Sequence, residues 1–245
     1  MGSILGAAAA AELGSVFNAP FAGIFFVLEV LLRDFSLRTF TPVVIAAVVS
    51  SAATQAALGN VPLFGVDPNL FTAEDKAFTL KQIPSYLVLG AACGAFGVFF
   101  NRGLAVSERL FERIPVPLIL RPAVGALLLD LLELGSLLLA RHPELPAFYG
   151  NGYEAIANLL KPEWYEHSDP RVPAALGGAA TVLLVLLLAK AVATWFTLGS
   201  GGSGGLFAPG LLLGAALGGA AGHVLRELGW TTAATPAHYA LLGMA

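Results

Sequence analysis

The residues from Leu198 to Pro209 combine two features that suit the binding of a small anion. They read LGSGGSGGLFAP, a glycine-rich stretch that leads directly into an apolar segment beginning at Leu206. Glycine lets the backbone approach a ligand closely, and the first turn of a helix presents backbone amides and the positive end of the helix dipole. The sequence therefore predicts an anion site at the amides of Leu206, Phe207 and Ala208. Pro209 suits the first turn, where a backbone donor is not needed.

The glycine-rich stretch lies between two long hydrophobic segments, 173–198 and 206–225. Irregular backbone at membrane depth is costly unless it lines a cavity or a ligand site. This context favours a site inside the membrane over a flexible surface linker. A phosphate-binding loop does not fit either, because no Gly-Lys-Ser/Thr follows the glycines.

A second set of candidate residues lies in the short apolar segment 19–32. Asn18 is positioned to cap a helix that begins at Ala19. Glu29 is an ionisable residue near the far end of that helix, and Lys190 is equally isolated in the segment 173–198. Intramembrane charges are costly and are normally paired. We therefore interpret Glu29 and Lys190 as buried structural charges that pair with each other.

The composition bounds the class of protein. Of 245 residues, 57% are apolar and 12% charged, with a mean hydropathy of +0.78, whereas soluble domains carry about 25% charged residues. The net charge of −3 gives no support for nucleic-acid binding. Cys93 is the only cysteine, which excludes a disulfide framework and a multi-cysteine metal site. Neither a metal nor a cofactor is indicated.

Short and long apolar segments alternate along the chain and are broken by glycine and proline. This pattern predicts an all-α integral membrane protein with tilted and broken helices, the architecture in which transporters place ion sites. The polar stretch 59–82 is the candidate joint between two parts. Both ends of the chain lie within apolar segments, so we expect the fold to be incomplete at both ends. The expected apolar helical segments are 19–32, 41–58, 84–113, 122–139, 173–198, 206–225 and one starting at His238.

Three ordered motifs give the chain a family resemblance. They are VFNAPFAGIFFVLE at 16–29, GNGYEAI at 150–156 and LGSGGSGGLFAP at 198–209. The sequence resembles the CLC chloride channels and chloride/proton antiporters, whose selectivity filter includes a G-x-F-x-P element. The resemblance implies chloride as the transported ligand and no other cofactor. It places the anion site at Gly204, Gly205, Leu206, Phe207, Ala208 and Pro209.

The resemblance also implies an organisation. Members of the family are homodimers of multi-pass subunits built from two inverted halves. Residues 1–58 would then be the end of the first half, 59–82 the inter-half loop and 83–245 most of the second half. The segments 19–32 and 41–58 would form the dimer interface in a cell membrane, the plasma membrane if the source is bacterial. The family's other filter loops, its gating glutamate and its inner tyrosine are not found here, so we expect this stretch alone to conduct no ions.

Val30 bears on the mechanism that the resemblance implies. Antiporters of the family commonly carry a proton-transferring glutamate directly after the position matched by Glu29. Valine cannot carry a proton, so the sequence favours a channel-like or proton-uncoupled protein.

Two other functions stay open. An anion transporter of an unrelated broken-helix family would use the same helix-terminus device. An intramembrane serine protease would need Ser203 as nucleophile with a histidine as base. His223 lies about 27 Å away at helical pitch, and His238 belongs to no protease motif, so a non-enzymatic function is favoured.

Overall fold

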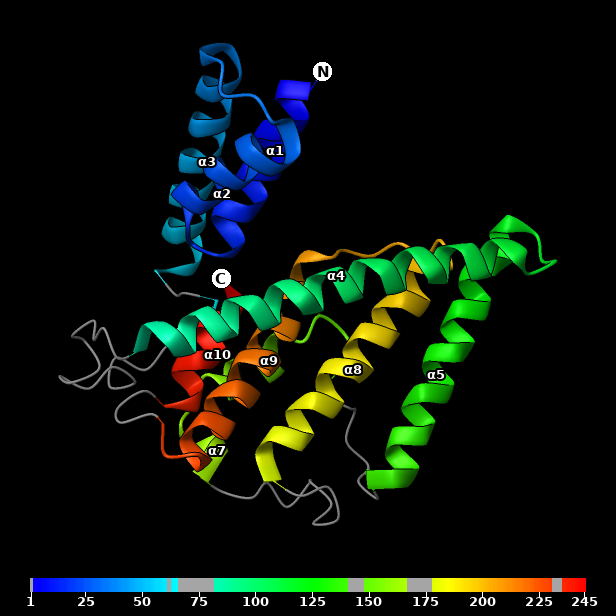
Figure 1. Cartoon of the computed structure of the whole chain (residues 1–245). Coiled ribbons are helices and arrows are strands. Elements are labelled where there is room, and N and C mark those ends of the chain that lie inside the picture. Colours follow the sequence, from blue (N-terminus) through cyan, green and yellow to red (C-terminus); the bar gives the residue numbers. More distant parts are fainter. Residues whose placement is uncertain (1, 61–62, 66–81, 141–147, 167–177, 231–234) are drawn as a thin grey trace. The chain divides into compact units, whose positions relative to one another are not determined.

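A computed structural model of the chain describes residues 2–60, 63–65, 82–140, 148–166, 178–230 and 235–245. Every regular element within these ranges is a helix, which confirms the predicted all-α class (Figure 1). The chain divides into two compact units, Met1–Gly65 and Val66–Ala245. Their boundary falls inside the predicted joint 59–82, most of which lies outside the described residues. The assignment of inverted halves stays a prediction.

Four helices in the described ranges are long and apolar enough to cross a membrane. Length and hydropathy both matter here, since a helix needs about 20 apolar residues to span the hydrocarbon core. The multi-pass character predicted from hydropathy agrees with this finding. The four candidate spans are Leu37–Leu58, Ile83–Arg113, Ala179–Gly199 and Phe207–Glu227.

The first unit packs small residues and branched apolar residues around one core. Gly14 of α1 (Gly2–Val16) and Gly23 of α2 (Pro20–Phe26) allow the two helices to approach closely, because a Cβ at Gly23 would lie 3.0 Å from the Gly14 nitrogen. The expected segment 19–32 is helical from Pro20 and changes to a π-helix at Val27. The elements are α1 (Gly2–Val16), α2 (Pro20–Phe26), η1 (Val27–Leu32) and α3 (Leu37–Leu58). The buried core consists of Ala10, Ile24, Val27, Leu28, Val43 and Ala47.

Asn18 ends one helix instead of capping the next. Its φ is +51°, in the left-handed region, and the Ala19 amide donates to the Gly14 carbonyl at 3.1 Å. This is the hydrogen-bond pattern of a helix C-terminus, at which asparagine is tolerated. The Asn18 side chain bonds to those of Gln55 and Asn60. The predicted capping of α2 was therefore wrong, because the tight turn between α1 and α2 takes Asn18 for its left-handed position.

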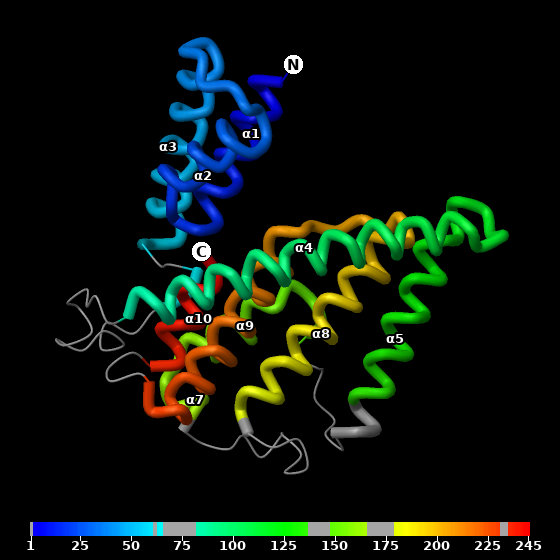
Figure 2. The backbone as a smooth tube through the Cα atoms, viewed as in Figure 1, coloured from blue at the N-terminus to red at the C-terminus, as the bar shows by residue number. Residues whose placement is uncertain are grey.

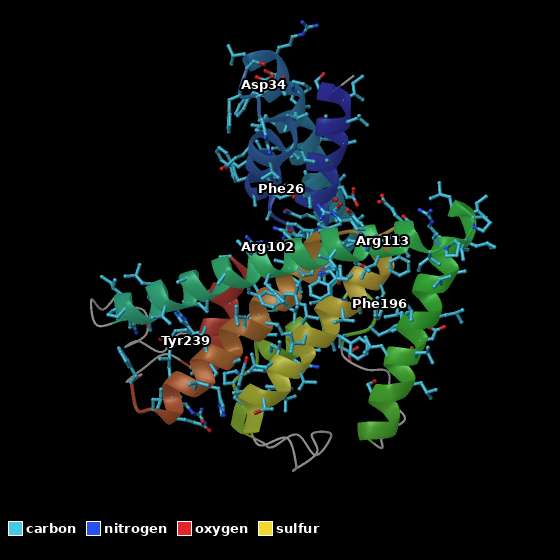
Figure 3. All side chains as sticks on the ribbon, turned by 45° about the vertical axis from the view of Figure 1, so that its right-hand side comes forward. Phe26, Asp34, Arg102, Arg113, Phe196 and Tyr239 are labelled. Carbon is cyan, nitrogen blue, oxygen red and sulfur yellow. The ribbon has the colours of Figure 1, made fainter. Side chains whose placement is uncertain are left out.

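In the second unit, α4 (Ile83–Arg113) lies across α8 (Gly178–Gly199) and α9 (Phe207–Glu227), as Figure 1 shows. The 31-residue α4 confirms the long helix expected from 84–113. α5 (Arg121–Ala140) packs on α8, where a Cβ at Gly125 would lie 2.6 Å from the carbonyl oxygen of Phe196, labelled in Figure 3. The remaining helices are η4 (Leu118–Leu120), α6 (Tyr153–Leu159), α7 (Glu163–Glu166) and α10 (Pro236–Met244).

Glycine also determines how α10 packs on α9. Cβ atoms at Gly214 and Gly218 would lie 2.1 Å and 2.0 Å from the carbonyl oxygens of Gly243 and Tyr239. The two backbones can lie this close only because both α9 positions are glycine. Tyr239, labelled in Figure 3, is fully buried, and its hydroxyl donates to Ser85 Oγ of α4 at 2.8 Å. This hydrogen bond connects α10 to α4.

Candidate functional site

Two of the five loop glycines end α8. The Gly201 amide donates to the Leu198 carbonyl at 2.9 Å and the Gly202 amide to the Thr197 carbonyl at 3.0 Å. With φ of +82° at Gly201, this is a Schellman motif, which satisfies the last carbonyls of a helix. A Cβ at Gly202 would also lie 2.6 Å from the Thr197 oxygen. These two glycines therefore have a structural role that the sequence interpretation did not separate from ligand binding.

The chain then runs without regular structure from Gly202 to Gly205 and coils into α9, as Figure 2 shows. α9 begins at Phe207, with Leu206 as the N-cap residue at φ −93° and ψ −18°. The predicted start at Leu206 is thus confirmed to within one residue. Pro209 is the third residue of the helix, inside the first turn as expected. The first-turn amides of a helix point toward its N-terminal end, where the dipole is positive.

A cavity of about 350 Å³ lies next to this helix start. It is bounded by α8, by Leu129 of α5 and by the turn at 148–151. Four of the six predicted site residues line it, namely Gly204, Gly205, Ala208 and Pro209. Leu206 and Phe207 do not line it; they are 46% and 40% exposed. The remaining lining residues are Phe148, Tyr149, Gly150, Asn151, Lys190, Ala193, Thr194, Thr197 and Leu198.

Lys190 contributes the only ammonium group among these lining residues. Its Nζ donates to the Phe148 carbonyl at 3.0 Å and to the Gly150 carbonyl at 2.6 Å, and the residue is 3% exposed. Burying an ammonium group is costly unless it is hydrogen-bonded or paired. Lys190 meets that requirement with backbone carbonyls in its own unit. Lys190 is thus buried and hydrogen-bonded within its own unit.

The surroundings of Glu29 are described within the first unit alone. In η1 the side chains of Val27 and Leu28 are buried, whereas Glu29 and Val30 are exposed on the first unit. Within the first unit the turn directs Val27 and Leu28 into the core and Glu29 outward, and the burial of Glu29 stays a prediction. Glu29 and Lys190 belong to different units, so their pairing stays a prediction.

The second motif, GNGYEAI, packs directly against α9. Gly152 has φ of +79°, and a Cβ on it would lie 2.7 Å from Leu212 Cδ2. α6 follows at Tyr153, and in α7 the Tyr165 hydroxyl donates to the Leu159 carbonyl at 2.9 Å. Burial raises the pKa of Tyr165 above its ordinary value of 10.0, so the hydroxyl stays neutral at physiological pH. Two residues of the motif, Gly150 and Asn151, line the cavity.

Ser203 is not arranged as a nucleophile. It is exposed, and among the described residues no hydrogen bond joins it to a histidine. His223 Nε2 lies 3.2 Å from Glu227 Oε1, and His238 Nε2 lies 3.4 Å from the Tyr86 hydroxyl. Activation of a serine needs a base within hydrogen-bond reach. The geometry of the described residues does not favour the protease alternative.

The arrangement offers electrostatic attraction to a small anion. It consists of a helix N-terminus, a glycine-rich loop that precedes it, and a buried ammonium group beside a cavity. The motif at 150–156 was used in the sequence analysis for the family resemblance and was assigned no ligand, so the turn at 148–152 was not placed beside the site. The signal that could have found it is the pair Gly150 and Gly152, since both take a positive φ that favours glycine.

Comparison with known proteins adds an independent result. A family model described as "Voltage gated chloride channel" matches residues 1–245. The chain is 31% identical to Chloride channel protein CLC-f of Arabidopsis thaliana over 99% of its own length and 30% of that protein. It is 30% identical to Putative chloride channel protein ClcB-like of Ralstonia nicotianae, over 96% of this chain and 48% of that protein. It is 31% identical to H(+)/Cl(-) exchange transporter ClcA of Vibrio cholerae, over 99% and 47% respectively. The chain spans at most about half the length of these relatives.

Proposed function

We propose that this chain, which belongs to the voltage-gated chloride channel (CLC) family, contributes part of the anion path of a membrane protein that transports chloride or a similar small anion. Relatives named as a chloride channel and as a proton/chloride exchanger both match it along nearly its whole length. Transport, and not catalysis, is the function that these similarities support.

The observation that carries the proposal is the junction of the glycine-rich loop with α9. The loop ends α8 with a Schellman motif at Gly201 and reaches Phe207 without further regular structure. An anion held by backbone amides and a helix dipole is bound without a full counter-charge, so it can also leave, as conduction requires. In this proposal the amides of Leu206 and Phe207 bind the anion, and Gly204 to Pro209 shape the approach.

The surroundings of the site belong to the same proposal. The apolar helices are embedded in a lipid bilayer, the plasma membrane if the source is bacterial. The protein is a homodimer through 19–32 and 41–58, which is supported by the exposed apolar side chains Phe21, Phe25, Ile45 and Val49 on α2 and α3. Cross-linking in native membranes distinguishes a dimer from a face covered by lipid alone.

Val30 favours transport of the anion without coupled proton movement. Its side chain is apolar and 54% exposed on the first unit, so it offers no group that binds a proton. In liposomes, chloride efflux with no accompanying proton uptake is expected. Uphill proton movement driven by a chloride gradient would contradict this part of the proposal.

The anion site is tested by nuclear magnetic resonance on the ¹⁵N-labelled chain. Chloride, but not gluconate, is expected to shift the amide signals of Leu206 and Phe207. The start of α10 provides an internal control, because the Thr235 side chain already accepts from the His238 amide at 3.4 Å. A shift confined to α10, or no shift at the α9 start, would refute the site. Chloride release from liposomes is measured in parallel on the full-length protein.

A further inference from the structure

We propose that Lys190 is a positioning residue, whose ammonium group fixes the turn at 148–152 and thereby holds the start of α9 in the place where it binds an anion. The inference rests on the proposed function for its anion-binding consequence. Its structural part concerns residues of the second unit only.

The first step is the attachment of the turn to α8. The Lys190 ammonium group donates two hydrogen bonds, to the carbonyls of Phe148 and Gly150, which lie 42 and 40 positions away in the sequence. Among the described residues of the second unit, no carboxylate lies within salt-bridge distance of Lys190. Within the second unit, the ammonium group therefore binds the backbone of the turn itself. Hydrogen bonds from a charged donor are stronger than neutral ones.

The second step is the contact of the same turn with α9. Gly150 and Gly152 have φ of +64° and +79°, which bends the turn sharply. A Cβ at Gly152 would lie 2.7 Å from Leu212 Cδ2, and Leu212 is fully buried. The Asn151 side chain accepts from the Tyr153 amide at 3.1 Å and connects the turn to α6. The turn is thus held by α8 on one side and packed on α9 on the other.

The third step is the path from the turn to the anion site. Residues 148–151 line the same cavity as Gly204, Gly205, Ala208 and Pro209. Leu212 is only five positions after Phe207, the first residue of α9. Packed interiors leave little free space, so a displacement of the turn is passed to its neighbours. Loss of the Lys190 hydrogen bonds is therefore expected to shift the first turn of α9.

Three substitutions separate positioning from a simple effect of charge. Lys190→Met removes both donors and the charge, Lys190→Gln keeps a neutral donor, and Lys190→Arg keeps charge and donors. The matched control is Lys161→Met, since Lys161 is exposed and its ammonium group, among the described residues, donates only to the Asn158 side chain, at 3.3 Å. Each variant is first checked for helical content, and the glutamine and arginine variants keep the test decisive if the methionine variant does not fold.

The first readout needs no anion. Lys190→Met is expected to shift the amide signals of Gly150, Gly204 and Leu212, and Lys161→Met is expected to leave them unchanged. The second readout is chloride affinity at the α9 start, which should fall about tenfold in Lys190→Met, since hydrogen bonds to a charged group are lost. Lys190→Gln should retain part of that affinity, and Lys190→Arg most of it.

The outcomes are distinguishable. Unchanged anion-free signals in folded Lys190→Met would overturn the positioning role. Equal loss of affinity in the glutamine and methionine variants would also overturn it, because the field of the charge would then act alone. If the wild-type chain shows no chloride-dependent shift while Lys190→Met still moves the anion-free signals, the proposed function fails and the positioning role stands.

Discussion

Replacing Gly218 with alanine is expected to loosen the packing of α10 on α9. A Cβ at Gly218 would lie 2.0 Å from the Tyr239 carbonyl oxygen and 2.8 Å from its carbonyl carbon. Non-bonded heavy atoms are most stable at about 3.5 Å or more, so the Tyr239 backbone has to retreat by more than about 1 Å. Because these atoms belong to a helix backbone, no side-chain rotation relieves the contact and α10 must move.

The size of the effect follows from two opposing contributions. Overpacking of this kind costs about 1–3 kcal/mol, and a backbone clash places Gly218 at the upper end of that range. The higher helix propensity of alanine offsets about 1 kcal/mol. We therefore expect the free energy of unfolding to fall by about 2 kcal/mol. Tyr239 would also lose the geometry of its hydrogen bond to Ser85.

The chain carries its own probe for this measurement. Cys93 is its only cysteine and packs, half-buried, beside Leu89 and Tyr239. Labelling by a thiol-reactive fluorophore during heating in detergent therefore reports the opening of the region around α10. Gly218→Ala should unfold several degrees below the wild type.

The matched control is Gly210→Ala on the same helix. Among the described residues, and apart from the helix's own backbone, no atom lies within 4 Å of a Cβ at Gly210, so alanine meets open space there. This variant should be as stable as the wild type, or more stable by up to about 1 kcal/mol. Equal unfolding midpoints for the two variants would refute the packing argument, as would a Gly218→Ala variant more stable than the wild type.

Two further predictions concern a helix end and a carboxylate. Gly201→Ala should lower the free energy of unfolding by about 1 kcal/mol, because φ at Gly201 is +82°. Gly205→Ala is the control, since φ at Gly205 is not positive. Equal thermal midpoints for the two alanine variants would contradict this prediction. Hydrogen bonds from the Thr39 hydroxyl and from the amide and hydroxyl of Ser36 lower the pKa of Asp34 below its ordinary value of 3.8. This stabilisation is present above pH 3.8 and is lost as the pH falls through the lowered folded value. Thr39→Val should therefore show a smaller acid-induced loss of stability than the wild type in pH-dependent melts, and identical profiles would argue against the contribution of Asp34.

The sequence by itself determined the features that depend on neighbouring residues. Runs of apolar residues fixed the long helices, such as α4 over Ile83–Arg113, because hydropathy and length act within one segment. The loop glycines and Pro209 fixed the start of α9 to within one residue, since backbone freedom and the missing proline donor are local properties. The ordered motifs also indicated the family, which the match to the family model shows independently.

Tertiary structure alone decided which distant groups meet. Asn18 could cap α2 or end α1, and the packing of α1, α2 and α3 selected the second role. Within the first unit, the π-helical turn gives the buried positions to Val27 and Leu28 and leaves Glu29 exposed. The partners of Lys190 lie 42 and 40 positions away, and helical periodicity within α8 carries no information about them. A partner at such separation depends on how whole helices pack, which the local sequence pattern does not encode.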